Sequence, residues 1–441
     1  MRLENNQTHR SVIWIAVSIW CLAGTAFAGV SSELPHVTKE MTEAEFWLKR
    51  LPEPDKPLLS PDAIEHLNRR NLSLEPSAID VTTLAEVLPG DELRRRLQEE
   101  IKPFRNRSFY TWDASGGNVL FGTIEFELLK ERMRMKDIPE KIGVRFGLIV
   151  QECDVRSFPL KEGIFAKKED EDFDLAQQTR LAVGTPVAVL WEGEGGGWLY
   201  TVNALLGGWV KKDSVGFFEN QAAMASYLGK PFLMVTVPSI TFDRTQKPDG
   251  IGTATLTMGT VLHGYTKHGS VYSVDYPVRA ENGRLAFESL AISEPESKGL
   301  HEGFLPFTRA NILRQALALE GAPYGWGGLN GGYDCSSFLQ NLFVTMGIQL
   351  PRNSGPQSKV GEILAEFSPG TEGRVKQDAL FLAPPLTTFV HLDGHIMLYL
   401  GAYRKRPYVI HATSGYQSKR FFRKKKYRLM SVVISDLSLG K

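Results

Sequence analysis

After an apolar N-terminal segment, the pattern of hydrophobic and polar residues divides this chain into three parts. Residues 30 to about 130 carry short helical patterns rich in Leu, Glu and Arg, separated by scattered prolines. From about 140 to 295, short strand patterns alternate with glycine turns. From about 300 onward, a helical pattern is followed by two strand patterns. The pattern predicts a mainly helical or irregular arm (29–135), a β region (136–297) and a C-terminal α+β domain (300–441).

The clearest helical pattern follows a glycine-rich loop that ends at Gly332. Asp334 is a good helix N-cap, so the helix is predicted to begin at Cys335. Apolar residues then recur at helical spacing, namely Phe338, Leu339, Leu342, Phe343 and Met346. This places Cys335 in the first turn of the predicted helix.

Cys335 is a candidate nucleophile. The positive end of the helix dipole favours thiolate over thiol at this position. A buried cysteine that packs as a small hydrophobic residue is the alternative. The glycine-rich approach favours a nucleophile, as do His395 and His411, which follow sixty or more residues later. One of these histidines can supply a base and the other can orient it.

Two strand patterns carry the histidines. Residues 394–400 and 407–413 both have the composition of strands, and residues 401–405 between them form a plausible five-residue hairpin loop. The pattern therefore predicts an antiparallel pair.

The register of that pair determines whether the histidines meet. If Leu400 pairs with Arg406, then His395 pairs with His411. Directly opposite residues point to the same face and lie about 5 Å apart. His391, four residues before His395 in a loop, is the alternative base.

Several short motifs of the C-terminal part together resemble the NlpC-type cell-wall cysteine peptidases, over about residues 305 to 435. The motifs are Pro323–Gly328 (PYGWGG), Asp334–Ser336 (DCS), Leu350–Ser354 (LPRNS) with Gln357, Gly394–His395 and Ile410–Ala412 (IHA). The resemblance implies a papain-like α+β fold with a Cys-His-His triad. It also implies cleavage of the γ-D-glutamyl bond to the diamino acid in peptidoglycan stem peptides.

Carried over by residue, the resemblance implies roles for four side chains. Cys335 would be the nucleophile, His395 the base and His411 the group that orients the base. Tyr324 would place its hydroxyl near the thiolate and help the backbone N–H of Cys335 to hold the oxyanion. Ser337 stands where the family usually has glycine, and this small residue is interpreted as a variation that leaves activity intact.

The resemblance also bears on specificity. In relatives with a fused SH3-like domain, the first barrel packs beside the active site and narrows the substrate groove. This implies that Asp334, with help from Ser336, receives the free amino group of an L-Ala-γ-D-Glu-diamino acid peptide. A carboxylate in a partly closed cleft pairs well with an ammonium group. Helix N-capping is the other role open to Asp334, and Ser354 is a further candidate for the same pocket.

The β region resembles bacterial SH3-like domains that accompany some of these peptidases. Its strands, glycine turns and Gly-Trp pairs predict one small barrel over 136–217, and a weaker copy is predicted over 218–297. Trp198 and Trp209 are expected in the barrel core rather than in ligand stacking. The arm over 29–135 is interpreted as wrapped on the other domains.

The N-terminus has the features of a secretory signal peptide over 1–28. Arg2 and Arg10 precede or flank an apolar run at 12–23, and an A-x-A cleavage site follows. The run is too short to span a membrane. The mature protein is therefore expected to begin at Gly29, in the periplasm or outside the cell, without an integral membrane segment.

Removal of the signal would leave only Cys153 and Cys335, so no disulfide framework is expected. Cys153 is most simply a packed thiol, because pairing with Cys335 would block the nucleophile. No phosphate-binding glycine motif in the right setting and no Cys/His metal cluster occurs, so neither a cofactor nor a metal is predicted.

The net charge and one basic run limit the kinds of molecule that this protein is expected to bind. The formal net charge of +1 excludes bulk electrostatic attraction to nucleic acid as the main function. A basic run at 419–428 could touch anionic wall polymer or membrane, or could simply be a solvated strand or loop edge. We expect a monomer whose partner is peptidoglycan or its stem-peptide fragments. A wall-binding scaffold with an inactive peptidase domain, and an amidase or acyltransferase on the same scaffold, remain alternatives.

Overall fold

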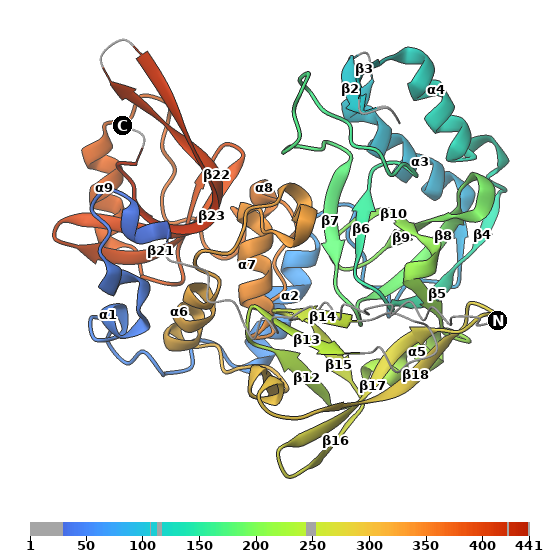
Figure 1. Cartoon of the computed structure of the whole chain (residues 1–441), viewed down its shortest axis with the longest axis horizontal. Coiled ribbons are helices and arrows are strands. Elements are labelled where there is room, and N and C mark those ends of the chain that lie inside the picture. The colour runs from blue at the N-terminus through green and yellow to red at the C-terminus, as the bar shows by residue number, and fades with distance from the viewer. Residues whose placement is uncertain (1–29, 106, 113–116, 244–252, 421–422, 440–441) are drawn as a thin grey trace, which may run out of the picture.

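The structure is a computed structural model that describes residues 30–439, apart from 106, 113–116, 244–252 and 421–422 (Figure 1). The predicted signal peptide and its cleavage before Gly29 lie outside the described residues. Within the described part of the chain, no helix has both the length and the apolar character that crossing a membrane requires.

The C-terminal domain packs helices against both faces of an antiparallel sheet (Figure 1). The sheet order is β20-β21-β22-β23, with bounds β20 Phe389–Leu392, β21 His395–Tyr403, β22 Arg406–Arg420 and β23 Arg423–Asp436. The helices are α6 Arg309–Ala318, α7 Cys335–Val344, α8 Ser354–Gln357 and α9 Gly373–Leu382. The mixed α+β prediction for this domain is confirmed.

Helix α7 begins where the sequence predicts. Oδ1 of Asp334 accepts the backbone N–H of Ser337 at 2.8 Å, and Oγ of Ser337 accepts the backbone N–H of Asp334 at 2.9 Å. The two bonds form a capping box. Ser337 therefore has a structural role of its own, and the predicted apolar stripe from Phe338 to Met346 is buried.

The register of β21 and β22 differs from the prediction. Tyr403 pairs with Arg406 across a two-residue turn, Arg404-Lys405, in which both residues have positive φ. The five-residue loop and the pairing of Leu400 with Arg406 are therefore wrong. Glycine and asparagine usually mark such turns, and this turn has neither, so the sequence carried no signal for it.

The histidines nevertheless share a face. Leu398 pairs with Ile410, with a β-bulge nearer the turn, so continuing the register places His411 opposite Met397 and two residues from His395. A shift of two residues keeps side chains on the same face, whereas a shift of one would move them to opposite faces. The error therefore leaves the predicted proximity intact.

The first barrel is a seven-stranded antiparallel sheet in the order β11-β5-β8-β9-β10-β6-β7. Its strands are β5 Arg145–Ile149, β6 Cys153–Arg156, β7 Gln177–Leu181, β8 Pro186–Glu192, β9 Trp198–Val202, β10 Gly207–Lys211 and β11 Val215–Phe217. Trp209 is fully buried, as predicted. Trp198 is only partly buried and lies under the Lys211 ammonium, 4.0 Å from the ring centroid, so the core prediction holds for it only in part. Cys153 is a buried free thiol, as predicted.

The second β block has its own apolar core, which includes Leu233, Leu256 and Val274. It contains α5 Gln221–Leu228, β12 Phe232–Val235, β13 Ser239–Asp243, β14 Thr253–Thr257, β15 Val261–His263, β16 Tyr265–His268, β17 Val271–Arg279, β18 Leu285–Ile292 and β19 Leu300–Glu302. These strands form three small sheets. The SH3-like character of this block stays a prediction.

The arm divides between two domains. Its described helices and strands are α1 Ala44–Leu48, α2 Pro61–Leu72, β1 Val87–Pro89, α3 Gly90–Ile101, β2 Phe109–Trp112, β3 Asn118–Phe121 and α4 Thr123–Arg132, and β1 pairs with β4 Lys141–Gly143 just beyond the arm. Trp47 and its neighbours pack into the core of the C-terminal domain. Leu93 and Leu97 pack instead into a core shared with the first barrel. Figure 1 shows α3 and α4 above the barrel, far from α1.

Candidate active site

The glycine-rich loop before Cys335 docks on the first barrel. In the 3-10 segment Trp326–Gly331, Gly327 and Gly328 have φ of 60° and 83°. A Cβ at Gly327 would lie 2.7 Å from Cγ of Gln177, so no side chain fits there. Nε2 of Gln177 also donates to the Gly327 carbonyl oxygen at 3.0 Å. The glycines therefore permit close packing of β7 beside the nucleophile.

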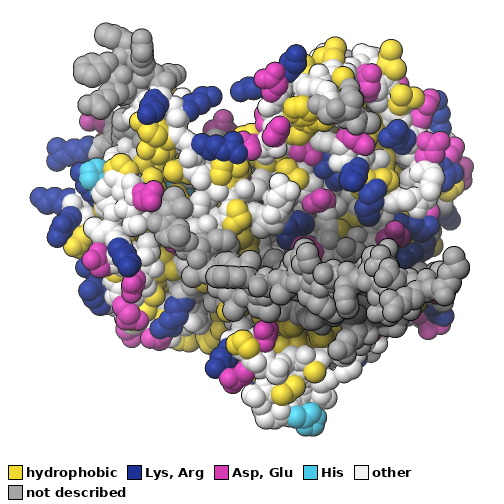
Figure 2. Space-filling model, in the orientation of Figure 1, with side chains coloured by type: hydrophobic (Ala, Val, Ile, Leu, Met, Phe, Trp, Pro, Cys, Tyr) yellow, Lys and Arg dark blue, Asp and Glu magenta, His cyan; other side chains and the backbone are white. Residues whose placement is uncertain are grey.

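Cys335 opens α7 and lines a cleft of about 920 Å³. The cleft lies between the C-terminal domain, the first barrel and the arm, whose side chains all contribute to its lining. Figure 2 shows the molecule hollowed between the lobe that carries β22 and β23 and the lobe that carries α3 and α4. The structure thus places the predicted nucleophile at a junction of domains.

The thiol of Cys335 is protonated at neutral pH. Burial raises its pKa to about 11, and the neighbouring Asp334 carboxylate acts in the same direction. The backbone N–H groups of Ile396 and Ser336 oppose this rise but are outweighed. The prediction that the helix dipole favours thiolate is therefore wrong for the resting protein, because desolvation of the charge is the larger effect. The thiol needs a base.

His395 and His411 form the predicted pair. Nε2 of His395 lies 2.8 Å from Nδ1 of His411, and the ring centroids are 5.0 Å apart. Burial lowers the pKa of His395 to about 4 and that of His411 to about 3. Both imidazoles are thus neutral at pH 7. Because Nε2 of His395 faces His411, its Nδ1 remains to accept a proton.

The pair continues to a residue that the sequence analysis missed. Nε2 of His411 lies 3.1 Å from Oγ of Ser435, a buried residue of β23. Ser435 has no motif around it, and only the pairing of β22 with β23 brings it to the histidine.

His391 lies outside the hydrogen-bonded pair, and its electrostatic interaction with His395 adds only a second, smaller lowering of the His395 pKa. It lies on β20 opposite Ile396, is exposed, and lines a separate groove beside α9. The structure brings His395 and not His391 to His411.

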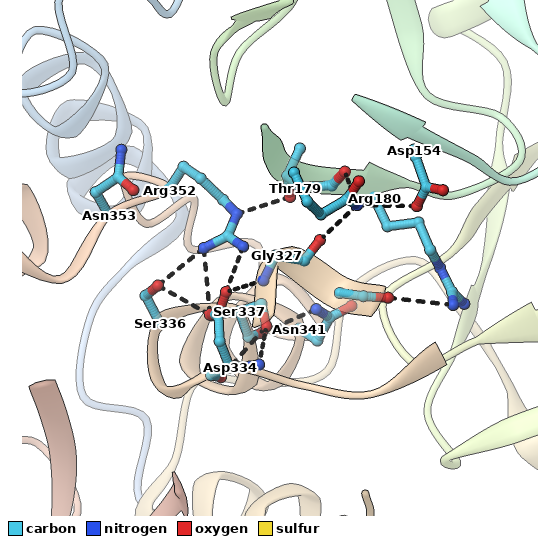
Figure 3. Close-up of polar contacts among 12 residues, drawn as sticks. Asp154, Thr179, Arg180, Gly327, Asp334, Ser336, Ser337, Asn341, Arg352 and Asn353 are labelled. Carbon is cyan, nitrogen blue, oxygen red and sulfur yellow. Dashed lines mark hydrogen bonds and ion pairs between the residues drawn. The ribbon is translucent and has the colours of Figure 1, made fainter. Parts of the chain in front are cut away.

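Asp334 is held in a buried network that sequence analysis missed (Figure 3). Nη2 of Arg352 donates to Oδ2 of Asp334 at 2.6 Å, and Nη1 donates to Oδ1 at 3.2 Å. Arg352 also donates to Oγ of Ser336 at 2.9 Å and, from Nε, to Oγ1 of Thr179 at 2.7 Å. The guanidinium therefore joins the helix cap to strand β7 of the barrel.

The network keeps Asp334 ionised. Burial alone would raise the pKa of this carboxyl, but Arg352 and the surrounding donors lower it on balance. Both oxygens are in use, since Oδ2 also accepts from the Gly327 N–H at 3.0 Å and Oδ1 from the Ser336 hydroxyl at 3.0 Å. The LPRNS motif contains Arg352, but nothing in the sequence indicates its partner.

The other predicted site residues line the same cleft. Tyr324 is partly buried, and burial raises the pKa of its phenol, which therefore stays a hydrogen-bond donor. Ser336 is buried within the Asp334 network. Ser354 opens α8 and is partly exposed. The structure thus gathers all seven predicted site residues around one region, with His411 behind His395.

The arm supplies two carboxyl groups to the wall of the cleft that faces Cys335 and the C-terminal domain. Glu75 accepts from Nδ2 of Asn353 at 3.1 Å and from the Ser77 hydroxyl at 3.2 Å. Glu100, on α3, accepts from the Gln178 amide, and burial raises its pKa to about 8. The sequence analysis named neither glutamate, because nothing in the arm indicates which surface it covers.

A loop of the first barrel completes that wall. The Phe173 ring packs on Trp326 at 5.6 Å and on Tyr324 at 6.3 Å between centroids. Its neighbour Asp172 pairs with Arg428 of β23, one of whose bonds is 2.9 Å long. Arg428 belongs to the basic run at 419–428, part of which lies outside the described residues. Among described residues, no group of three or more His, Cys, Asp or Glu side chains is placed to hold a metal ion.

Comparisons with known proteins agree with this architecture. Residues 321–424 match the NlpC/P60 family, and residues 163–211 match an SH3 domain of the SH3b1 type. The chain is 28% identical over 134 residues to the gamma-D-glutamyl-L-lysine dipeptidyl-peptidase of Bacillus subtilis, covering 30% of this chain and 40% of that protein. It is 36% identical over 97 residues to the protein of the same name in Bacillus cereus, covering 21% and 26%. It is 27% identical over 150 residues to the peptidoglycan endopeptidase RipA of Mycobacterium tuberculosis, covering 28% and 29%.

The chain therefore spans 40% or less of the length of these three relatives. The solved structure of an NlpC/P60 endopeptidase from Photobacterium damselae subsp. piscicida matches over 90% of both chains, with a TM-score of 0.70 and 19% identity, a likeness of fold. The resemblance drawn from the sequence motifs is confirmed: this chain carries a C-terminal NlpC/P60 domain preceded by an SH3 domain of the SH3b1 type.

Proposed function

We propose that this chain is a cell-wall cysteine endopeptidase that hydrolyses the γ-D-glutamyl–diamino acid bond of peptidoglycan stem peptides. The observation that carries the proposal is the hydrogen bond between His395 and His411 beside a cleft that Cys335 also lines. The names of the relatives support the substrate class. The retained thiol and both imidazoles argue against an inactive scaffold.

The geometry suggests a stepwise acyl transfer. Nδ1 of His395 takes the thiol proton as the Cys335 sulfur attacks the γ-carbonyl carbon. The oxyanion is held by the backbone N–H of Cys335 and by the Tyr324 hydroxyl. Collapse breaks the C–N bond, the His395 proton passes to the leaving amine, and water then releases the acyl group.

Three substitutions test this assignment. Cys335→Ala should abolish hydrolysis, and Cys153→Ala, the matched control, should retain it. His395→Ala should lose about 10²- to 10⁴-fold in rate, the range of a positioned base. His411→Ala should lose less, because it acts through His395. Mass spectrometry of products from purified muropeptides measures all four, and wild-type turnover by Cys335→Ala would contradict the mechanism.

The same product analysis separates the enzymatic alternatives. A γ-D-glutamyl endopeptidase releases a peptide that begins with the diamino acid. All three kinds of enzyme pass through an acyl-enzyme, so the catalytic residues alone do not separate them. Their products do, because an amidase would leave a different new terminus and an acyltransferase would leave a transferred acyl group.

We propose further that the enzyme prefers peptides with a free N-terminal L-Ala. Asp334 and Ser336 lie beside the nucleophile, but Arg352 and other donors already occupy both Asp334 oxygens. Glu75 accepts only two hydrogen bonds among described residues, and a carboxylate has about four acceptor sites. An ammonium group would therefore gain a direct contact from Glu75 and longer-range attraction from Asp334.

A free tripeptide and its N-acetylated form test the preference. We expect a higher kcat/KM for the free amine, and a smaller ratio in Glu75→Gln than in the wild type. Asp334→Asn should also reduce the ratio, together with overall activity. Equal kcat/KM for both peptides in the wild type would refute amine recognition and leave the peptidase proposal standing.

We propose that the protein is exported and acts as a monomer. The support for export is the signal-like segment at 1–28 together with a substrate that lies outside the cytoplasm. N-terminal sequencing of the mature protein should begin at Gly29. A cytoplasmic chain that begins at Met1 would contradict export, and a dimer in light scattering would contradict the monomer.

A further inference from the structure

Ser435 is hydrogen-bonded to His411 at the end of the pair away from His395, and the mechanism above gives it no role. It lies on β23 opposite Val409, with 3% of its surface exposed. Its Oγ is 3.1 Å from Nε2 of His411, whose Nδ1 is 2.8 Å from Nε2 of His395. Three side chains from three neighbouring strands, β21, β22 and β23, thus form one continuous hydrogen-bonded row.

The row has two possible proton arrangements, because each neutral imidazole carries one N–H. In the first, Nε2–H of His411 donates to Ser435 and Nε2–H of His395 donates to His411. Nδ1 of His395 then carries a lone pair. In the second, the Ser435 hydroxyl donates to His411, His411 donates from Nδ1, and His395 carries its proton on Nδ1.

Only the first arrangement gives a competent base. Nδ1 is the ring nitrogen of His395 that the row leaves unoccupied, so a lone pair there can accept the proton of Cys335. A proton on the same nitrogen would block the transfer. The tautomer of His395 therefore depends on whether Ser435, at the other end of the row, accepts a hydrogen bond from His411 or donates one to it.

Ser435 is well placed to set that polarity. A buried N–H without an acceptor costs about 1–3 kcal/mol, so Nε2–H of His411 requires a partner at this position. The lowered pKa of His411 is caused by burial and by the neighbouring His395, and neither of these places an anion beside the ring. When the Ser435 hydroxyl accepts, it thus favours the Nε2–H tautomer of His411 without adding a buried charge.

We propose that Ser435 is a positioning residue that accepts a hydrogen bond from Nε2–H of His411 and thereby holds His395 in the tautomer with an unprotonated Nδ1. The inference extends the proposed peptidase mechanism and rests on it for its kinetic consequence. The tautomer itself can be observed without any substrate.

The direct test is nitrogen NMR of the full mature chain with ¹⁵N-labelled histidine at pH 7. Signals of His395 and His411 are assigned with His395→Gln and His411→Gln. In the wild type, both rings should show a protonated Nε2 and a bare Nδ1. In Ser435→Ala, His411 should shift toward the Nδ1–H form or toward exchange between the two forms.

Matched variants separate a tautomer effect from a packing effect. Ser431, also buried on β23, donates to the backbone carbonyl of Ala322 rather than to either histidine, so Ser431→Ala is the control. Ser435→Thr and Ser435→Val have the same shape and differ only in the hydroxyl. Thr should keep the wild-type tautomers and Val should not, which preserves the test if Ser435→Ala fails to fold.

The kinetic readout is a fall in kcat with KM unchanged. We expect about a tenfold loss of kcat in Ser435→Ala, below the about 10²-fold minimum for loss of a base, and recovery in Ser435→Thr. Iodoacetamide should also alkylate Cys335 more slowly in Ser435→Ala than in Ser431→Ala.

Two outcomes would overturn the proposal. One is wild-type ring-nitrogen shifts in Ser435→Ala and Ser435→Val, and the other is equal losses in Ser435→Thr and Ser435→Val. If stem peptides proved not to be substrates, the alkylation and NMR results would still decide the role of Ser435. The failure of the peptidase proposal would thus be distinguishable from the failure of this one.

Discussion

One wall of the cleft belongs to the C-terminal domain and the other to the arm and first barrel, and different contacts hold the two walls. The first wall is tied by the buried Asp334–Arg352 pair and the His395–His411 pair. The second carries the buried Glu75, which accepts from Asn353, and the Asp172 loop, whose ion pair with Arg428 is largely exposed. The chemistry thus lies on the wall that one domain builds, while other domains supply the groups that limit access.

Removing the buried ion pair between Arg352 and Asp334 in the first wall should have the largest effect on the free energy of unfolding. Arg352→Met leaves the Asp334 carboxylate buried without its cation and should cost about 3–5 kcal/mol of unfolding free energy. Urea denaturation measures the change. Arg374→Met, at an exposed pair with Asp378, is the control and should unfold like the wild type. A near-neutral Arg352→Met would show that the network contributes little to this wall.

One ionisable group on each wall, His395 on the first and Glu100 on the second, should change the free energy of unfolding with pH in opposite directions. The pKa of His395 is lowered to about 4, so between pH 4 and 6.5 the unfolded state binds more protons and stability falls as pH falls. The pKa of Glu100 is raised to about 8, so between pH 4.5 and 8 the folded state binds more protons and stability falls as pH rises. Each group contributes up to about 1.4 kcal/mol per pH unit.

Urea unfolding at pH 4.5, 5, 6.5 and 8 separates the two contributions. Glu100→Gln should be more stable than the wild type at pH 8, with little difference near pH 4.5. The double variant His395→Gln/His411→Gln should lose less stability than the wild type between pH 6.5 and 5. Parallel pH profiles for all three proteins would contradict the opposite signs.

The contact between the walls can be weakened at Gln177. Its amide donates to the Gly327 carbonyl oxygen at 3.0 Å and to Asp154 at 2.9 Å. Gln177→Ala should cost about 1–3 kcal/mol, because the buried carbonyl oxygens of Gly327 and Thr179 lose a donor, and should raise KM more than it lowers kcat. Gln377→Ala, which removes an exposed hydrogen bond to the Lys405 carbonyl oxygen outside the cleft, is the control. A change confined to kcat would argue that the barrel acts on the chemistry itself.

The Arg428–Asp172 pair should have the smallest effect. Arg428 is 67% exposed, and exposed pairs contribute about 0–1 kcal/mol. A double-mutant cycle with Arg428→Ala and Asp172→Ala measures the coupling, which should decrease further in high salt. A coupling above this range, or one insensitive to salt, would mean that the hairpin and the loop are joined more firmly than their exposure indicates.

Local pattern determined much of the C-terminal domain. The Asp334 cap, the start of α7 at Cys335 and the buried stripe from Phe338 depend on neighbours within one or two turns, so the sequence was sufficient to predict them. The proximity of His395 and His411 was also predicted, although the register was not. Strand faces repeat every two residues, so an error of two left the shared face unchanged.

Tertiary structure alone decided the rest of the site. Arg352 reaches Asp334 over a separation of 18 residues and Thr179 over 173, and Glu75 reaches Asn353 over 278. Ser435 meets His411 only through the pairing of β22 with β23. The sequence by itself determined which groups could do chemistry, because their types and local caps are encoded nearby. Their protonation and partners depended on burial and on contacts between domains, which no local pattern contains.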